Sequence, residues 1–299
     1  LGIGPGDKIV TTPYSFFASA GSISRVGAEP VFVDIDPQTF NLDPNLLEDV
    51  LKRERNVWAI QPVHLFGACA DLDPILELGR KYSAIVVEDA AQAIGAEYKG
   101  QRCGAIGTLG CFSFYPGKNL GGYGDSGGLT TNDPELAEDL YKLRLHGATN
   151  KYFHEMVGIN SRIDTLQAAV LKVKMRHLDA WTSARQRNAA TYQNLLSKSP
   201  VQLPAATPYQ TRHVWNQFTI LGERRDELKS HLATHGIGTE IYYPLPLHLQ
   251  ECFSEFGYER GQFPVSEAMA EQALSLPVYP ELAPEDLTYV ADCIDAFYR

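Results

Sequence analysis

The sequence has no apolar run near the roughly 20 residues that a helix needs to cross a bilayer. It also has no surplus of basic residues, because 26 Lys and Arg stand against 36 Asp and Glu, for a formal net charge of -10. Nucleic acids and anionic lipids are bound by clustered Lys and Arg side chains. We therefore expect neither nucleic acid nor a membrane as a partner, and local groups must bind any anionic ligand.

Cysteine is scarce, and no two cysteines form a C-x-x-C pair. The five that are present are odd in number and widely spaced: Cys69, Cys103, Cys111, Cys252 and Cys293. This usage is typical of reduced thiols and predicts a cytoplasmic protein. No metal is expected, because His231 and His235 have the spacing of helical ligands but lack the intervening glutamate of H-E-x-x-H.

The length of 299 residues exceeds the usual size of one hydrophobic core, which predicts a large domain with a smaller second one. In the first half, apolar β-rich runs alternate with helical patterns. Such a pattern is expected of an α/β fold in which helices cover both faces of a largely parallel sheet. The predicted strands lie within residues 8–15, 30–36, 57–67, 84–90, 111–115 and 127–133.

Helix starts are predicted where aspartate precedes proline, because aspartate caps a helix and proline suits its first position. This pattern occurs at Asp43-Pro44, Asp73-Pro74 and Asp133-Pro134. Residues 163–197 keep a helical pattern without proline or glycine, which predicts one long connecting helix. A smaller α+β domain follows, with a strand near 213–221 and helices near 223–235, 264–276 and 284–298. The predicted domains are residues 1–180 and residues 181–299, the second including the connector.

One lysine stands in an unusual setting, the stretch "CFSFYPGKNLGGYGDSGG" at residues 111–128. A phosphate loop of the Walker A type is excluded, because six residues separate Gly110 from Gly117 and an asparagine follows Lys118. The letters GYGDSG at 122–127 fit G-x-G-x-x-G, but they lead into a predicted strand, whereas a dinucleotide fingerprint opens a helix. The glycines therefore indicate neither nucleotide hydrolysis nor dinucleotide binding.

A carboxylate ends another predicted strand, in "AIVVEDAAQAIG" at residues 84–95. In open α/β sheets, ligands bind at the carboxyl ends of the strands, where Asp89 would lie; its alternative role is to cap a helix. Asp89 and Lys118 together suit pyridoxal 5'-phosphate (PLP), whose aldehyde bonds a lysine and whose pyridine nitrogen is kept protonated by an aspartate. A solvated loop position is the alternative for Lys118.

Eight stretches spread over nearly the whole chain resemble the DegT/StrS family of sugar-nucleotide aminotransferases. They are "GPGDKIVTTPYSFFASA", "PVFVDIDPQTFNLDP", "PVHLFG", "VVEDAAQAIGAEYKG", "CFSFYPGKNLGGYGDSGG", "LRLHGA", "VGINSRIDTLQAA" and "YPLPLHLQ". The resemblance implies a fold type I PLP-dependent transferase. Such an enzyme has a three-layer α/β/α large domain with a mainly parallel sheet and a smaller α+β C-terminal domain.

The resemblance also implies roles for the matching positions. Lys118 would bond the cofactor and transfer protons, and Asp89 would pair with the pyridine nitrogen. Gln92 would lie beside the ring and its phenolic oxygen. Ser113 would bind the phosphate, and Phe16 would stack on the ring.

Three further positions are implied to contact ligands across or beside the site. Asn160 matches an asparagine that reaches the phosphate from the opposite subunit, which implies a homodimer with shared active sites. Arg162 and His248 would contact the anionic nucleotide-sugar. An arginine that caps its helix and a histidine that packs in the core are the alternatives for these two residues.

The implied reaction moves nitrogen from an amino acid, expected to be L-glutamate, to a nucleotide-linked 3- or 4-keto hexose. The product would serve amino-sugar biosynthesis for a surface polysaccharide or a glycosylated metabolite. Relatives that dehydrate sugars carry histidine in place of Lys118, so the remaining alternative is a catalytically silent sensor that binds PLP or sugar. Family members have a preceding helix that also holds the phosphate, and we expect this sequence to lack that segment and to retain the cofactor less well.

Overall fold

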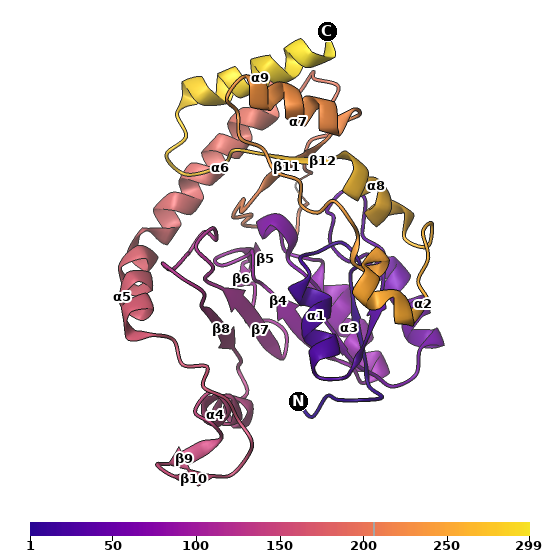
Figure 1. Cartoon of the computed structure of the whole chain (residues 1–299), viewed down its shortest axis with the longest axis vertical. Helices are drawn as coiled ribbons and strands as arrows, with labels where there is room; N and C mark the ends of the chain where they lie inside the picture. Colours follow the sequence, from indigo (N-terminus) through magenta and orange to yellow (C-terminus); the bar gives the residue numbers. More distant parts are fainter. Residues whose placement is uncertain (206) are drawn as a thin grey trace.

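The structure is a computed structural model that describes residues 1–205 and 207–299 (Figure 1). Its centre is a six-stranded sheet of order β2-β1-β3-β4-β7-β8. The strands are β1 (Lys8–Thr11), β2 (Glu29–Phe32), β3 (Val57–Ile60), β4 (Ile85–Asp89), β7 (Leu109–Ser113) and β8 (Gly127–Thr130). All neighbours pair in parallel except β7 and β8. The predicted mainly parallel sheet is confirmed, and each predicted strand is present; β7 begins two residues earlier than predicted, and the others are shorter.

Helices cover both faces of this sheet. The large-domain helices are α1 (Ala18–Arg25), α2 (Pro44–Arg53), α3 (Leu72–Tyr82) and α4 (Pro134–Leu143). Alternate strand residues pack on opposite sides: Val10, Ile60 and Val86 join the core formed with α2 and α3. Ile9, Ala59 and Val87 lie in the cluster that includes Ile23 of α1. The α/β/α layering follows from this period-two burial.

Two of the three predicted helix caps are confirmed. Asp43 accepts a hydrogen bond from the backbone N–H of Asn45 at 2.8 Å, and Asp133 accepts one from Glu135 at 2.9 Å. The third prediction was wrong, because α3 begins at Leu72 and Asp71 occupies its cap position. The hydroxyl of Tyr98, distant in sequence, accepts from the backbone N–H of Asp73 at 3.0 Å and donates to Asp71 at 2.7 Å. The backbone N–H of Asp73, at the start of α3, is therefore bonded by Tyr98, a residue distant in sequence. The side chain of Asp73 does not cap the helix.

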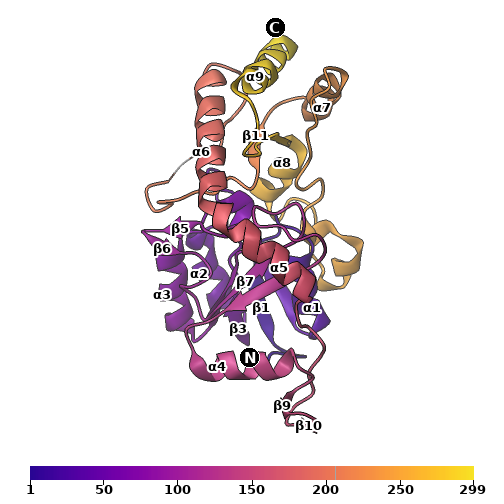
Figure 2. The same cartoon turned by 90° about the vertical axis from the view of Figure 1, so that its left-hand side faces the viewer.

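The connecting helix is interrupted. It consists of α5 (Thr165–Lys174), a 3₁₀ turn (Met175–His177) and α6 (Leu178–Leu195), so the prediction of one continuous helix was wrong. Figure 2 shows α6 rising from the sheet toward the C-terminal elements. These are the antiparallel pair β11 (Phe218–Leu221) and β12 (Ala273–Leu276) with α7 (Arg225–Thr234), α8 (Pro264–Gln272) and α9 (Pro284–Tyr298). The predicted helix 264–276 therefore ends at Gln272, because the next four residues pair with β11. The domain boundary at residue 180 stays a prediction.

Shorter elements complete the chain. The hairpins are β5 (Glu97–Tyr98) with β6 (Gln101–Arg102) and β9 (Ala148–Asn150) with β10 (Phe153–His154). Further 3₁₀ turns span Leu65–Gly67, Leu247–Leu249 and Glu251–Phe256. No helix in the described ranges has the length and apolarity that crossing a membrane would require.

The C-terminal part packs directly on the large domain. Asp34, which follows β2, accepts hydrogen bonds from the backbone N–H groups of Val265 and Ser266 at 2.9 and 3.0 Å. The hydroxyl of Ser266 donates to the same carboxylate at 2.6 Å. Since Asp34 and Ser266 are buried, these bonds hold the start of α8 against the sheet.

Two cysteines are joined in a disulfide, Cys69 with Cys103, across 34 positions of sequence. The expectation that all thiols are reduced was therefore wrong for this pair, while Cys111, Cys252 and Cys293 are free. Both bonded cysteines lie in one buried cluster with Ala93. The fold brings the loop after β3 beside the segment before β7, a proximity that sequence spacing does not reveal.

Candidate active site

The predicted site residues Asp89 and Lys118 follow neighbouring strands. Asp89 is the last residue of β4, and Lys118 lies five positions after β7 ends at Ser113. The register pairs Asp89 with Cys111 of β7. Because β4 and β7 run parallel, their carboxyl ends meet at the same edge of the sheet, where α/β proteins bind ligands.

The carboxylate of Asp89 is held by two donors. Its Oδ2 accepts from the hydroxyl of Ser19 at 2.7 Å, and its Oδ1 accepts from the backbone N–H of Ala91 at 3.2 Å. The hydroxyls of Ser15 and Ser19 are also 2.8 Å apart. Since the one proton of Ser19 goes to Asp89, Ser15 must donate to Ser19. This chain fixes the orientation of the carboxylate, and neither serine was identified from the sequence.

Lys118 is half-buried, and its amine makes no hydrogen bond or ion pair with any described residue. Burial lowers the pKa of Lys118, and the charge of Asp89 opposes that effect in part. Both groups follow neighbouring parallel strands, so they lie at the same edge of the sheet. A lysine with a lowered pKa has a larger neutral fraction than a solvated one, as a nucleophile requires.

Gln92 is buried beside this pair and uses both ends of its amide. Its Oε1 accepts from the backbone N–H of Phe66 at 2.6 Å, and its Nε2 donates to the hydroxyl of Tyr243 at 3.1 Å. Phe16 is 57% exposed, with its ring centroid 6.1 Å from that of Tyr243. Sequence reasoning assigned no role to Tyr243, although it is the first residue of the stretch "YPLPLHLQ".

Ser113 ends β7 on the same edge of the sheet. Its hydroxyl accepts from the backbone N–H of Tyr115 at 3.3 Å and is otherwise without a partner in the described chain. The structure thus brings Asp89, Gln92, Ser113 and Lys118 to one edge of the sheet. The ring of Phe16 lies near that of Tyr243, which bonds Gln92. Their contacts with a cofactor stay predictions.

The remaining predicted residues are not part of this cluster. Asn160 and Arg162 are exposed, in the segment after the β9–β10 hairpin, and Asn160 pairs through its backbone with Leu145. His248 is buried, with its Nε2 3.2 Å from Oε1 of Glu267. Burial lowers the pKa of His248, and the bond with Glu267 opposes it. The nucleotide-sugar roles of Arg162 and His248 stay predictions.

Glu88, one residue before Asp89, points to the opposite face and anchors a loop. Its carboxylate accepts from the backbone N–H groups of Gly104, Ile106 and Gly107 at 2.6 to 2.8 Å and lies 2.9 Å from Nε2 of His64. Burial acts to raise the pKa of Glu88, but these hydrogen bonds outweigh it and the pKa lies below its ordinary value. His64 in turn donates its backbone N–H to the carbonyl of Asp89 at 2.9 Å, so the end of β4 is held rigidly.

His64, Glu88 and Cys103 also have ligand atoms within 4.8 Å of one another, as a metal would require. Nδ1 of His64 accepts from the backbone N–H of Ala70 at 3.1 Å, so Nε2 carries the ring proton. Cys103 is in the disulfide. With no lone pair left on the imidazole and no thiolate, this group does not suit a metal.

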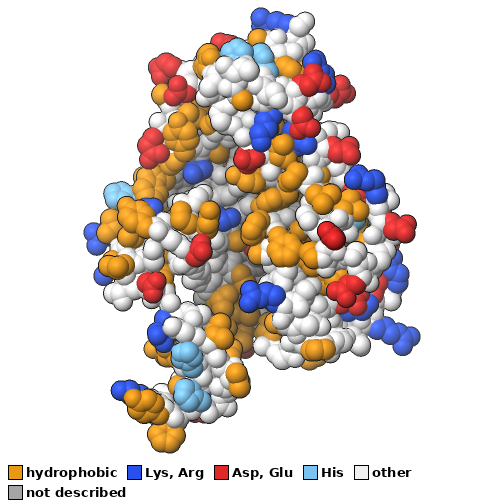
Figure 3. All heavy atoms as spheres, in the orientation of Figure 1, with side chains coloured by type: hydrophobic (Ala, Val, Ile, Leu, Met, Phe, Trp, Pro, Cys, Tyr) orange, Lys and Arg blue, Asp and Glu red, His pale blue; other side chains and the backbone are white. Residues whose placement is uncertain are grey.

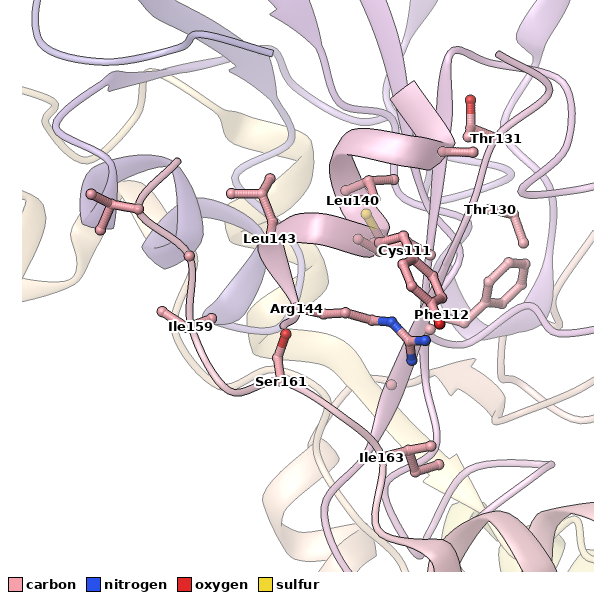
Figure 4. Close-up of a pocket in the computed structure, with 17 residues that line it drawn as sticks. Cys111, Phe112, Thr130, Thr131, Leu140, Leu143, Arg144, Ile159, Ser161 and Ile163 are labelled. Atoms are coloured by element: carbon pink, nitrogen blue, oxygen red, sulfur yellow. The ribbon is translucent and has the colours of Figure 1, made fainter. Parts of the chain in front are cut away.

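A cavity of about 1090 Å³ lies between β7, β8, α4 and residues 157–163 (Figure 4). Arg144 extends into it, and most of the other labelled side chains are apolar, such as Leu140, Ile159 and Ile163. Its lining includes Cys111 but not Asp89, Gln92 or Lys118. These three predicted site residues therefore lie outside the lining of this cavity.

Comparison with known proteins assigns the family. The DegT/DnrJ/EryC1/StrS aminotransferase family matches residues 1–295. The chain belongs to this family. It is a PLP-dependent aminotransferase of fold type I, and its cofactor is PLP.

Individual relatives cover nearly all of this aminotransferase. A Geobacillus stearothermophilus protein named pleiotropic regulatory protein is 50% identical over 301 residues, covering 100% of this chain and 80% of the relative. The dTDP-3-amino-3,4,6-trideoxy-alpha-D-glucose transaminase of Streptomyces venezuelae is 44% identical over 295 residues, covering 98% and 77%. A crystal structure of S. venezuelae DesV in complex with a ketimine intermediate has a TM-score of 0.96 at 43% identity, covering 99% and 79%.

The groups at the strand ends of this aminotransferase fit PLP. An aldehyde needs an amine that is not tied up in an ion pair, and the amine of Lys118 has no partner in the described residues. A pyridine nitrogen needs a fixed carboxylate, and Asp89 is held by Ser19 and Ala91. The donor set therefore matches both ends of the cofactor.

Proposed function

We propose that this aminotransferase transfers an amino group from L-glutamate to a 3- or 4-keto hexose carried on a nucleotide. The name of the S. venezuelae relative supports a nucleotide-linked amino sugar as the product. The observation that carries the proposal is the pair of Lys118, an amine with a lowered pKa, and Asp89, a fixed carboxylate, at one sheet edge. The product would supply amino-sugar biosynthesis for a surface polysaccharide or a glycosylated metabolite.

PLP, when bound, supplies an aldehyde that takes up amines and a ring that withdraws electrons from the reacting carbon. Asp89 keeps the proton on the ring nitrogen, because an opposite charge favours the protonated form. Lys118 accepts a proton from the substrate carbon and returns it, which requires an amine that is partly neutral. Phe16, Gln92 and Ser113 orient the cofactor at the strand ends.

The proposal predicts two linked products. Incubation of the holoenzyme with L-glutamate should release 2-oxoglutarate, and a following panel of keto-sugar nucleotides should give one product in which an amino group replaces the keto oxygen. Enzymatic assay of 2-oxoglutarate and mass spectrometry of the sugars measure these outcomes. L-Aspartate and L-glutamine are the control donors. Absence of amino transfer from every donor to every sugar would reject the enzymatic proposal.

That negative outcome would favour the second candidate, a silent PLP- or sugar-binding regulator. The name of the Geobacillus relative supports this candidate. A silent binder, however, has no need of an amine with a lowered pKa beside a fixed carboxylate. The geometry of Lys118 and Asp89 therefore favours the enzyme.

We also propose a homodimer in which Asn160 reaches the partner's cofactor. The β9–β10 hairpin projects from the body in Figure 1, and apolar side chains gather over it in Figure 3. Val157 and Ile159, which follow the hairpin, are 97% and 66% exposed, and α4 has no buried residue. Large apolar side chains exposed in one region are typical of an interface between proteins.

Native mass spectrometry tests the dimer. The chain should be dimeric at micromolar concentration, and Val157→Asp should shift it toward monomer because a charge would be desolvated at the interface. Tyr289→Asp is the matched control, because Tyr289 is 48% exposed on α9, at the other end of the molecule. A wild-type monomer, or equal effects of both substitutions, would contradict the proposal.

A further inference from the structure

The C-terminal segment at Tyr242 and Tyr243 is bonded to the same stretch that carries Phe16. The hydroxyl of Tyr14, which is fully buried, donates to the backbone carbonyl of Tyr242 and accepts from the backbone N–H of Tyr243 at 2.8 Å. Both hydrogen-bonding functions of that hydroxyl are thereby used. The backbone of residues 242–243 is therefore fixed relative to Phe16, two positions beyond Tyr14.

The amide of Gln92 has one defined orientation. Its oxygen accepts from the backbone N–H of Phe66 at 2.6 Å, and one of its two N–H groups donates to Tyr243 at 3.1 Å. Rotating the amide by half a turn would set its NH₂ group against the backbone N–H of Phe66 and lose that bond, so the backbone donor fixes the orientation. The second N–H has no acceptor in the described residues, so a bound ligand can receive it.

Tyr243 is linked to the predicted site by its hydrogen bond with Gln92, which lies three positions after Asp89. Burial raises the pKa of Tyr243, the hydrogen bond from Gln92 opposes this, and the charge of Asp89 adds to it. The phenol thus stays neutral at physiological pH and acts toward Gln92 as an acceptor. The Tyr243 hydroxyl, from the C-terminal domain, therefore contacts Gln92 at the edge of the sheet where Asp89 lies.

We propose that Tyr243 is a positioning residue that acts on the cofactor through Gln92. Its hydroxyl holds the amide so that the second N–H of Gln92 donates to the phenolic oxygen of PLP. The proposal rests on the proposed function, in which Gln92 lies beside that oxygen.

Tyr243→Phe is the direct test, because it keeps the ring beside Phe16 and removes only the hydroxyl. A hydrogen bond donated to the phenolic oxygen withdraws negative charge that otherwise stabilises a bound proton nearby. Weakening that bond should raise the pH at which the visible absorption of bound PLP titrates, by about half a unit. kcat should fall about 3- to 10-fold with KM for the keto sugar nearly unchanged, as loss of one hydrogen bond implies.

The adjacent tyrosine supplies the matched control. The side-chain hydroxyl of Tyr242 makes no hydrogen bond with a described residue, so Tyr242→Phe should leave the titration midpoint unchanged. Gln92→Leu should raise the midpoint by itself, which keeps the test decisive if Tyr243→Phe folds poorly. Adding Tyr243→Phe to Gln92→Leu should cause no further rise, because both act through one amide.

Three results would overturn the inference: an unchanged midpoint in Tyr243→Phe, an unchanged midpoint in Gln92→Leu, or additive shifts in the double variant. Each can occur while the wild-type enzyme binds PLP and transfers nitrogen from L-glutamate. Failure of the proposed function would instead appear as loss of those wild-type properties. The two failures are therefore distinguishable.

Discussion

Lys118→Ala is expected to abolish the visible absorbance of lysine-bound PLP and to lower the transamination rate by about 10³-fold or more. The substitution removes both the amine that bonds the aldehyde and the group that moves the proton. The absorption spectrum of the dialysed protein and single-turnover release of 2-oxoglutarate measure the two effects. Because the amine has no partner among the described residues, its loss should leave thermal stability nearly unchanged.

Lys118→Arg is the matched control for that experiment. Arginine keeps the positive charge beside Asp89, but its guanidinium stays protonated and cannot bond the aldehyde. It should therefore resemble Lys118→Ala in spectrum and rate. A wild-type spectrum in either variant would reject Lys118 as the cofactor lysine, and with it the proposed site.

Asp89→Asn is expected to lower kcat by about 10- to 10³-fold, while the affinity for PLP changes much less. Asparagine preserves size but not charge, and an opposite charge next to a titrating nitrogen shifts its pKa by about one to three units. Without the carboxylate, the ring nitrogen loses its proton near neutral pH and withdraws electrons less well. Steady-state kinetics and fluorescence titration with PLP separate the two parameters.

Ser19→Ala provides the graded control for Asp89. It keeps the charge and removes only the 2.7 Å hydrogen bond to Oδ2, so kcat should fall by about 3- to 10-fold. Equal losses in the two variants would mean that the orientation of the carboxylate matters more than its charge. Full activity in Asp89→Asn would exclude a role for Asp89 at the ring nitrogen.

Local sequence predicted the strands and the residues at their ends because strand burial and chain direction are short-range properties. The apolar run before Asp89 forms β4, and the aromatic run before Lys118 forms β7. Parallel pairing of these two strands was enough to place both groups at one edge. The caps at Asp43 and Asp133 were predictable for the same reason, since a cap bonds residues only two or three positions away.

In several places, long-range contacts made the structure differ from the predictions that rested on local sequence patterns. α3 begins at Leu72 and not after Asp73, where Tyr98 contacts Asp71 and Asp73. α8 ends at Gln272 and not at residue 276, because β12 pairs with β11. The disulfide joins cysteines 34 residues apart that no motif links. In each case the partner lies far along the chain, where periodicity and capping patterns carry no information.

The sequence by itself determined the α/β alternation and the family, and it predicted the pair of Lys118 and Asp89, because each is written in contiguous stretches. Only the tertiary structure decided which residues contact Asp89 and Gln92: Ser19 on α1 bonds Asp89, and Tyr243, 151 positions from Gln92, bonds its amide. The physical reason is that a hydrogen bond requires atoms within about 3 Å, and chain folding alone brings such distant residues that close.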